Sequence, residues 1–495
     1  MKYHLLVAAA APFVFPMAVG AQTTANAQGS EAPKKVFITG VAKGRDLLAS
    51  AISASALDEA QVERLSARSL PEILRSIPGI RAEATGDEAN ANYTIRGLPL
   101  ASAGSKYVQF QEDGLPVLEF GDMTLIGMDS FLRTDLGISQ IQTIRGGSAS
   151  TFSSNSPGGV INFISNTGST DGGDVQLSSG LDFELYRLDF NYGGRIADGW
   201  RFNVAGFYRQ GEGVRKLGYD GLKGGQFKFN VTRDLAGTGY IRIYAKYLDD
   251  RTPTYPLGLM RATGSDASPS YQMLANFDPR KDTLLSPYLR DLRGLDINNN
   301  VTREDLADGI HSVVKSVGVE AQFDVSGWTV SEKFRFADMS MNLASNYPTL
   351  TAGAGAMVEL FGGAGSTLKY VTGPNAGRTI VDLANLNDNG LLALSVVGTT
   401  SSHTVNNITN DLRASRTMAL GGGDLTTTAG IYFARQSLGS NVNLQTRLMD
   451  VRGGGQAALL DVSDAAGNAI TQGGVFTYFL CTEQRSLSES PRRRL

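Results

Sequence analysis

The sequence predicts a mainly β protein: an N-terminal mixed α/β domain followed by a partial antiparallel transmembrane β-barrel. Three observations carry this prediction. Beyond residue 171, short segments alternate apolar and polar side chains between Gly-rich turns, and successive side chains of a strand face opposite ways. Residues 45–170 mix helical and β-prone segments, and an apolar leader opens the chain. With 42% hydrophobic and 19% charged residues and a mean hydropathy of −0.11, the composition suits a barrel that is apolar outside and wet inside.

Residues 1–21 are predicted to be a signal peptide. Lys2 and His4 give a short basic start, Leu5–Val19 is apolar without an acidic residue, and small residues precede Ala21. Ala25–Ala27 offers a second cleavage position. The alternative is a membrane anchor, but an apolar run of about 15 residues is short of the roughly 20 that span a bilayer. We therefore expect export with cleavage, then a flexible polar start at residues 22–34.

Residues 45–170 predict one compact mixed domain. Residues 57–65 begin a helical stretch, and Ser69–Ile77 predicts a short helix. Ser69 would cap that helix, and Glu72 would complete a capping box. Pro78-Gly79 ends it. The strands expected in this domain are residues 93–96, 107–111, 140–144 and 159–164.

Residues 171–480 carry the barrel pattern, in segments at 175–177, 187–192, 200–204, 227–231, 241–243, 317–325 and 425–433. A soluble β-sandwich also alternates, and the leader and the preceding domain favour the membrane. The long polar inserts at about 250–312 and 338–405 are predicted to be extracellular loops.

Within the first insert, Asp296–Asn300 invites a calcium-loop hypothesis. Val301 stands where that loop needs glycine, and Ala307 where it needs a bidentate glutamate. Thr302–Leu306 is better interpreted as a capping box that begins a short helix.

Several function classes are disfavoured. A net charge of −3 gives no reason to expect a nucleic-acid partner. One cysteine, Cys481, allows no internal disulfide framework and no Cys-rich metal site, and the three histidines are scattered. No nucleophile motif, HExxH or phosphate loop with lysine is present. We expect no enzyme activity and no cofactor.

Three motifs follow one another within about 130 residues. They are Thr94-Ile95-Arg96-Gly97, then Glu112-Asp113-Gly114-Leu115-Pro116, then Ile144-Arg145-Gly146-Gly147 closing in Pro157-Gly158-Gly159. In this order, behind a secretory leader, they resemble the plug domain of TonB-dependent outer-membrane transporters. The resemblance covers residues 35–170 closely, and beyond them only the beginning of the expected barrel. It implies an outer-membrane receptor that takes up a scarce ligand, such as a siderophore-type iron chelate, through a plugged barrel.

Residues 35–41 resemble the TonB box, the segment these transporters offer to the energy-coupling protein of the inner membrane. The residues assigned to it are Val36, Phe37, Ile38, Thr39, Gly40 and Val41, within a flexible region 22–44. An apolar, extended strand without a partner is a site for β-augmentation by another chain. The alternative is that this segment is the first strand of the plug sheet.

The resemblance also implies how the plug is held. In the family, the motif arginines, here Arg96 and Arg145, pair with carboxylates of the barrel lumen. Gly97 and Gly146 permit tight turns after them. Alternation places Glu320 on the face opposite Val319, which makes it a lumenal candidate. Ligand would bind above the plug, near residues 98–106 and 119–130 and in the barrel loops. Residues 22–34 are too short for a signalling domain or a carboxypeptidase-like extension.

The barrel is shorter than the resemblance implies. Family barrels have 22 strands, which need on the order of 500 residues after the plug, whereas about 325 follow residue 170. The basic tail 481–495 breaks the alternation and is expected to be unstructured. A truncated or frameshifted chain explains both features, and a short variant that closes a smaller barrel or joins a second chain is the alternative. The competing function is a non-transporting remnant that keeps only the plug and an incomplete barrel.

Overall fold

The computed structural model describes residues 36–494 except for residues 40–44, 47–51, 66, 68, 85–87, 90, 100–106, 120–121, 124–125, 148–152, 236, 257, 296–299, 477–480 and 489–491. The predicted signal peptide, the start of the mature chain, and Gly40 and Val41 of the box-like segment lie outside the described residues.

The plug domain is built on a five-stranded sheet with the order β3-β10-β11-β6-β7. Its strands are β3 (Ala54–Asp58), β6 (Val108–Glu112), β7 (Leu115–Pro116), β10 (Ile138–Arg145) and β11 (Gly159–Ser165). Three two-stranded sheets accompany it: β1 (Val36–Phe37) with β2 (Arg45–Asp46), β4 (Ile80–Glu83) with β5 (Asn92–Ile95), and β8 (Asp122–Met123) with β9 (Ile126–Gly127). The helices are α1 (Glu59–Leu65), α2 (Leu70–Leu74) and the 3-10 turn η2 (Met128–Phe131).

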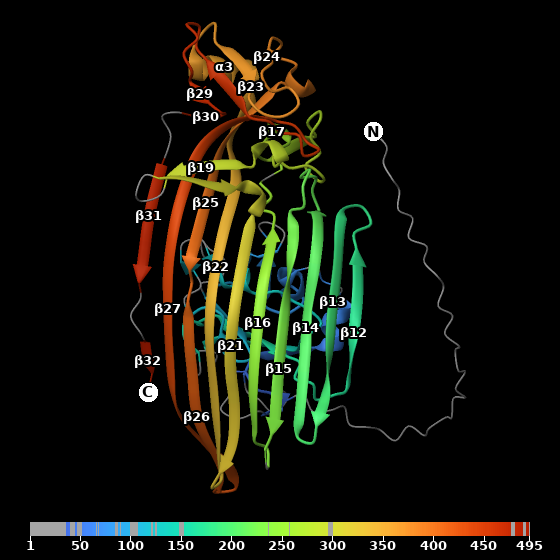
Figure 1. The fold of residues 1–495 in the computed structure, drawn as a ribbon, viewed down its shortest axis with the longest axis vertical. Coiled ribbons are helices and arrows are strands. Elements are labelled where there is room, and N and C mark those ends of the chain that lie inside the picture. The colour runs from blue at the N-terminus through green and yellow to red at the C-terminus, as the bar shows by residue number, and fades with distance from the viewer. Residues whose placement is uncertain are drawn as a thin grey trace, which may run out of the picture. The chain divides into compact units, whose positions relative to one another are not determined.

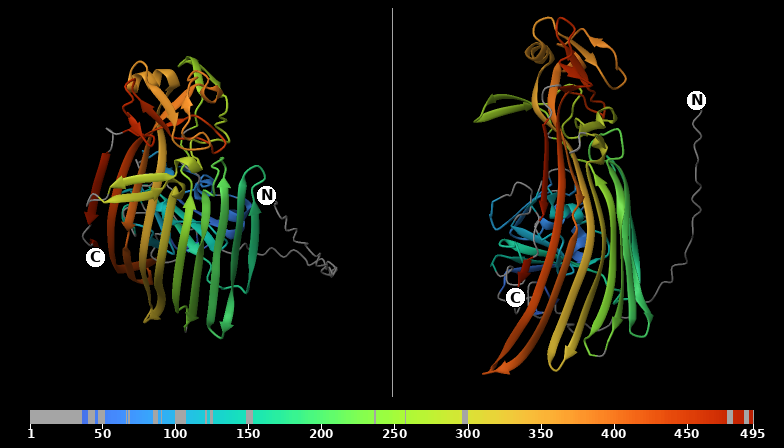
Figure 2. Two further views of the ribbon diagram at one scale, coloured as in Figure 1. Left: turned by 45° about the horizontal axis from the view of Figure 1, so that its top comes forward. Right: turned by 60° about the vertical axis from the view of Figure 1, so that its left-hand side comes forward.

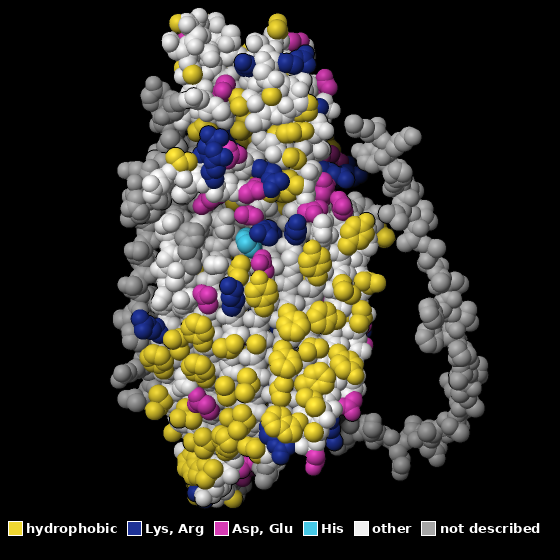
Figure 3. All heavy atoms as spheres, viewed as in Figure 1, with side chains coloured by type: hydrophobic (Ala, Val, Ile, Leu, Met, Phe, Trp, Pro, Cys, Tyr) yellow, Lys and Arg dark blue, Asp and Glu magenta, His cyan; other side chains and the backbone are white. Residues whose placement is uncertain are grey.

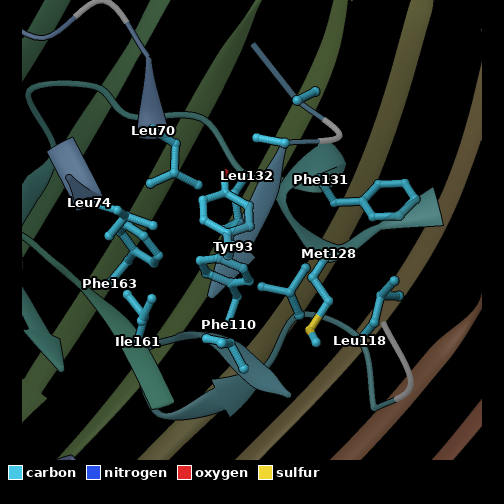
Figure 4. Close-up of a cluster of buried hydrophobic side chains, with 14 of the residues drawn as sticks. Leu70, Leu74, Tyr93, Phe110, Leu118, Met128, Phe131, Leu132, Ile161 and Phe163 are labelled. Carbon is cyan, nitrogen blue, oxygen red and sulfur yellow. The ribbon is translucent and has the colours of Figure 1, made fainter. Parts of the chain in front are cut away.

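The plug core forms where α2, the strand pair β4–β5 and the main sheet meet (Figure 4). Tyr93 packs edge-on against Phe110, with ring centroids 5.0 Å apart, and Phe110 stacks on Phe163 at 6.4 Å. The same cluster continues into apolar side chains of the large sheet, including Leu248, Val314 and Met339. Plug and sheet therefore share one hydrophobic core.

Helix capping differs from the sequence prediction. At α1, Asp58 and Gln61 cap each other, since the Gln61 amide donates to Asp58 Oδ1 at 2.9 Å and the Asp58 amide to Gln61 Oε1 at 3.0 Å. At α2, Ser69 is the N-cap residue but its side chain accepts no capping hydrogen bond. The capping box predicted at Ser69–Glu72 is therefore wrong. Pro71 fixes the start of this helix from its first turn.

A 14-stranded antiparallel sheet holds all the long strands that follow the plug (Figure 1). Neighbours follow the order β12-β13-β14-β15-β16-β21-β22-β25-β27-β30-β29, and β26 continues the line of β25 between β22 and β27. The long strands are β12 (Gly172–Ser179), β13 (Glu184–Ala197), β14 (Trp200–Gly213), β15 (Leu222–Asp234), β16 (Tyr240–Thr252), β21 (Ile310–Val325), β22 (Trp328–Gly353), β25 (Leu391–Thr404), β26 (Asn407–Leu420) and β27 (Gly423–Asp450). Each segment predicted to alternate lies in one of them.

The inserts hold more regular structure than predicted. The first contains β17 (Arg261–Ser265), β18 (Ser268–Gln272), η4 (Pro287–Leu289), β19 (Asp291–Leu295), β20 (Val301–Asp305) and η5 (Leu306–Asp308). The capping box predicted at Thr302–Leu306 is wrong, because residues 301–305 are strand β20. The helical turn that follows toward His311 is η5, and the Asp305 side chain caps it by accepting a hydrogen bond from the Ala307 amide. The second insert is shorter than the predicted 338–405, since β22 runs to Gly353 and β25 starts at Leu391.

A small lobe forms from this second insert and residues 451–476. Its elements are α3 (Ala354–Gly362), β23 (Thr367–Tyr370), β24 (Thr379–Ile380), η6 (Leu386–Asp388), β28 (Leu460–Ser463), β29 (Thr471–Gln472) and β30 (Val475–Phe476).

The tail also departs from prediction. β31 (Cys481–Ser488) and β32 (Arg492–Arg494) both pair antiparallel with β27. The expectation that residues 481–495 are unstructured is therefore wrong for these two segments. β27 is 28 residues long, and its edge offers backbone donors and acceptors to which even a basic segment can pair.

The two faces of the large sheet differ in chemistry. The plug lies against the concave face (Figure 2). The opposite face carries a band of hydrophobic side chains across the lower half of the long strands (Figure 3). Exposed apolar residues of this face are Tyr192, Tyr208, Phe227, Ile243, Val317, Phe336 and Ile431. No helix in the described part of the chain is long and apolar enough to cross a membrane.

Candidate functional site

The plug is anchored to the sheet by a buried cluster of two arginines and two carboxylates. Arg133, just after η2 in the plug, places its Nε 2.6 Å from Asp250 Oδ2 on β16. Arg209 on β14 lies 2.6 Å from the same oxygen and 2.7 Å from Glu88 Oε2 of the plug. All four side chains are at most 8% exposed. Charges desolvated to this degree are stable only when paired, so the four residues act as one unit that joins plug and sheet.

Two lysines of neighbouring strands extend this contact. Lys246 Nζ on β16 lies 2.6 Å from Glu112 Oε1 and donates to the Phe131 carbonyl at 3.0 Å. Lys228 Nζ on β15 lies 2.8 Å from Asp135 Oδ1. Burial alone would raise the pKa of Glu112, but Lys246, Arg335 and Lys228 together outweigh burial, so the pKa of this carboxyl is lowered. The plug therefore places two carboxyl groups beside lysines of the sheet.

Glu320 lies on the plug-facing side of β21, where alternation predicted it, and is 8% exposed. Its partners are residues of the sheet: Arg242 at 2.8 Å, Lys333 at 3.3 Å and the Tyr240 hydroxyl at 2.7 Å. Lys333 in turn donates to the Asp113 carbonyl of the plug at 2.5 Å. Glu320 thus reaches the plug through Lys333.

The predicted turn Asp113-Gly114 receives that lysine. Both residues have positive φ, 52° and 87°, and a Cβ on Gly114 would lie 2.9 Å from Lys333 Nζ. The positive φ of Gly114 therefore favours glycine, and a side chain there would also displace the Lys333 ammonium. Asp113 also accepts hydrogen bonds from the amide and hydroxyl of Ser165 at 2.8 and 2.9 Å. Burial raises the pKa of Asp113, and the Ser165 amide opposes that rise.

Contacts on the β26–β27 side complete the interface. The Tyr432 hydroxyl donates to Glu119 Oε2 at 2.6 Å, and the Glu119 amide donates to Gln436 Oε1 at 2.9 Å. Asn407 donates to the Val117 carbonyl at 3.1 Å. The plug is therefore bound along the sheet from β14 to β27.

The motif arginines lie elsewhere. Arg145 donates to Ser55 Oγ and the Pro78 carbonyl, both at 2.8 Å, within the plug itself. A Cβ on Gly146, whose φ is +94°, would lie 2.9 Å from Arg96 Nη1. Among the described residues, no carboxylate lies within 4.0 Å of either guanidinium. The pairing of Arg96 and Arg145 with barrel carboxylates stays a prediction.

The box-like segment has a partner strand, contrary to prediction. Val36 and Phe37 pair with Asp46 and Arg45 of β2, and Phe37 is buried against Ile144 and Val160. The amides of Ile38 and Thr39 both donate to Gln142 Oε1 of β10 at 3.0 Å. This segment is docked on the plug by a short strand, one buried phenyl ring and one glutamine, while Ile38 is 45% exposed.

Asp129 is a buried acid that the sequence did not single out. It accepts hydrogen bonds from the Ala91 amide at 2.8 Å and the Tyr93 hydroxyl at 3.0 Å. Burial raises its pKa to about 6, although these hydrogen bonds and Arg133 oppose the rise. Burial and the neighbouring Asp129 also raise the pKa of Tyr93.

The anchoring residues Arg133, Arg209, Asp250, Lys246 and Lys228 were missed by sequence reasoning. Alternation, which placed Glu320 on the inner face, could also have placed the four residues on β14, β15 and β16. No sequence signal identifies Arg133 as their partner. The predicted ligand loop 98–106 lies almost wholly outside the described residues, and the described residues hold no cluster of metal-ligating side chains.

Comparison with known proteins agrees with this architecture. Residues 46–160 match the model of the TonB-dependent Receptor Plug Domain. A vitamin B12 transporter of Vibrio vulnificus is 27% identical over 164 residues, 32% of this chain and 25% of that protein. The FpvAI–pyocin S2 complex superposes with a TM-score of 0.51 at 11% identity, covering 91% of this chain and 53% of the other. FpvA of P. aeruginosa bound to heterologous pyoverdines gives 0.50 at 12%, covering 92% and 56%.

The chain thus spans about half the length of these two solved chains. At this identity the superpositions show the fold alone, a compact mixed domain on a large antiparallel sheet. The Vibrio vulnificus relative is named as a transporter.

Proposed function

We propose that this chain, which carries the plug domain of TonB-dependent receptors, belongs to an outer-membrane receptor for active uptake of a scarce small ligand. One observation carries the proposal: a folded plug is anchored by buried ion pairs to the concave face of a sheet whose outer face bears an apolar band. Such a band fits lipid, and a polar inner face occupied by a plug fits gated passage.

The proposed partners follow from the same architecture. A TonB-type protein of the inner membrane would bind residues 36–41 by strand addition, after this segment leaves Gln142 and β2. The ligand is a siderophore-type iron chelate or another small nutrient such as a cobalamin. Two relatives support these alternatives by name, one as a vitamin B12 transporter and one with bound pyoverdines. No metal or cofactor is proposed as a resident group.

A second function is favoured by the sheet edge. Among the described strands, β12 pairs only with β13, so the sheet does not close on itself. A plug-containing protein that binds the coupling protein without transporting is consistent with that edge. Heat-modifiable migration of membrane-extracted protein separates the two functions, because a closed barrel resists unfolding by detergent.

The coupling step is tested with Ile38→Pro in the full chain. Proline removes the Ile38 amide and cannot donate to an added strand. We expect the variant to insert into the outer membrane normally and to lose binding of a purified periplasmic TonB fragment. Tyr271→Pro, on the exposed hairpin β17–β18, is the control and should bind like the parent chain. Binding of the Ile38→Pro variant at the parental level would remove the box assignment.

A further inference from the structure

A row of polar side chains crosses the outer face of the sheet. Cross-strand register makes it continuous: Arg251 lies opposite His311, His311 opposite Asn342, Asn342 opposite Ser401, and Ser401 opposite Asn441. Val317 and Val319, which share the face of His311 by alternation, are 54% and 37% exposed. The row therefore belongs to the same face as the apolar band.

The row lies directly above that band. Between them, Lys315 on β21 stands opposite Asp338 on β22. Below this pair come Phe336 and Phe334 on β22. The outer face thus changes from exposed phenylalanines to charged and amide side chains within a few residues of strand. In Figure 3 the hydrophobic band gives way to charged side chains and a histidine near the middle of the view. If the apolar band lies in the bilayer, the row lies at the level of the lipid head groups.

The hairpin β19–β20 folds over this row (Figure 1). Glu304 Oε1 accepts a hydrogen bond from Ser401 Oγ at 2.9 Å, and Gly294 lies against Asn443 of β27. Hairpin and sheet enclose a cavity of about 820 Å³. The size suits a small ligand.

The lining of the cavity is chemically mixed. The sheet contributes the amides of Asn342, Asn441 and Asn443, and the hairpin contributes Arg303 and Asp305. Amide side chains both donate and accept hydrogen bonds, guanidinium groups only donate, and carboxylates only accept. Among the described residues, Thr302 Oγ1 is buried without a hydrogen-bond partner. Cations and carboxylates occur together, which favours neither a simple anion nor a simple cation.

We infer that this cavity binds a saccharide, the head group of a glycolipid in the outer leaflet. Each sugar hydroxyl both donates and accepts a hydrogen bond, which matches a lining that contains amide, guanidinium and carboxylate groups together. The position above the apolar band brings such a head group to the opening. The inference rests on the membrane placement in the proposed function, but not on uptake.

The test uses the full chain in detergent micelles with two probes: rough lipopolysaccharide, and the core oligosaccharide released from it by mild acid. The variant Asn342→Leu/Asn441→Leu removes two amides from the cavity. Gln210→Leu is the matched control, because Gln210 stands in the same row through Lys223 but outside the cavity. We expect the double variant to raise the Kd for both probes at least tenfold and Gln210→Leu to leave it within twofold.

A second variant protects the test against misfolding. Ser340→Trp fills the cavity from the sheet side and should also abolish binding, with circular dichroism checking both variants. Equal affinity in the parent chain and both cavity variants would overturn the inference. Binding of the oligosaccharide tighter than that of intact lipopolysaccharide would overturn the glycolipid source. A failure of uptake or coupling assays alone would leave this binding result standing, and so distinguishes it from the proposed transport.

Discussion

Two sets of basic residues in this molecule do different work. Arg96 and Arg145 belong to recognisable turn motifs, and the contacts of Arg145 stay within the plug, on Ser55 and the Pro78 carbonyl. Arg133 and Arg209 belong to no motif, yet they carry the buried contact between plug and sheet. The comparison teaches that motif residues can shape a domain while residues without a motif dock it.

The largest effect is expected from Asp250→Ala. It leaves two buried guanidinium groups, those of Arg133 and Arg209, without their shared carboxylate, and breaking a buried pair costs about 3–5 kcal/mol. We expect the plug to detach, seen as rapid cleavage of the plug by protease in micelles. Asp305→Ala is the matched control, because Asp305 pairs with Arg290 at the surface, 36% and 45% exposed, where a pair contributes about 0–1 kcal/mol. Equal protease resistance in the two variants would show that the buried cluster does not hold the plug.

A smaller effect is expected from pH acting on Asp129. Its pKa of about 6 in the folded plug lies above the usual value of about 4 for aspartate. The Asp129 carboxyl therefore binds a proton more tightly in the folded plug than in the unfolded chain. The stability that results is complete below about pH 4 and is lost as pH rises through about 6, with a total on the order of 2–3 kcal/mol.

The measurement is the urea concentration at which half of the plug is released, at pH 4 and at pH 7, with proteolysis as the readout of release. Asp129→Asn keeps an oxygen for the Ala91 amide and the Tyr93 hydroxyl but cannot ionise. The difference between variant and parent should therefore change between the two pH values. A constant difference would contradict a raised pKa of Asp129.

The sequence could predict the plug from its turn motifs, and the lower halves of the long strands from their alternation of apolar and polar residues. Alternation alone placed Glu320 on the inner face, since one face of these strands carries exposed apolar side chains and the other faces the plug. Residues 338–353 were missed as strand. In this upper part of β22, both faces are either covered by other residues or solvated. Ala344, for example, packs into the core beneath the first insert. The alternation of apolar and polar residues is therefore lost there.

The residues that dock the plug on the sheet could be paired only from the fold itself. Arg133 and Asp250 are 117 residues apart in sequence, and nothing local couples them. The box-like segment illustrates the same limit: its strand character was predicted, but its partner β2 and its anchor Gln142 were not. The tail was misjudged because pairing with β27 depends on an available backbone edge, which composition does not report.

The motif arginine gives the third prediction. Arg145→Ala removes hydrogen bonds to Ser55 and the Pro78 carbonyl, a loss of about 1–2 kcal/mol from the plug. We expect local opening near β3, seen as faster hydrogen exchange of residues 54–58, with the plug still protected from protease at the sheet. Detachment equal to that of Asp250→Ala would instead support pairing of Arg145 with a barrel carboxylate.

The smallest effect concerns release of the box-like segment. Thr39 donates its hydroxyl to Gln142 Oε1 at 2.7 Å and accepts from Asn162 at 3.0 Å. Thr39→Val removes both bonds with little change of shape, so docking should weaken by about 1 kcal/mol. A TonB fragment should then bind roughly fivefold more tightly, because less free energy is needed to free the strand. Thr143→Val on the same strand as Gln142 is the control, since Thr143 Oγ1 is buried without a partner among the described residues. Tighter binding in Thr143→Val as well would mean that general loosening of the plug, not release of residues 36–39, exposes the segment.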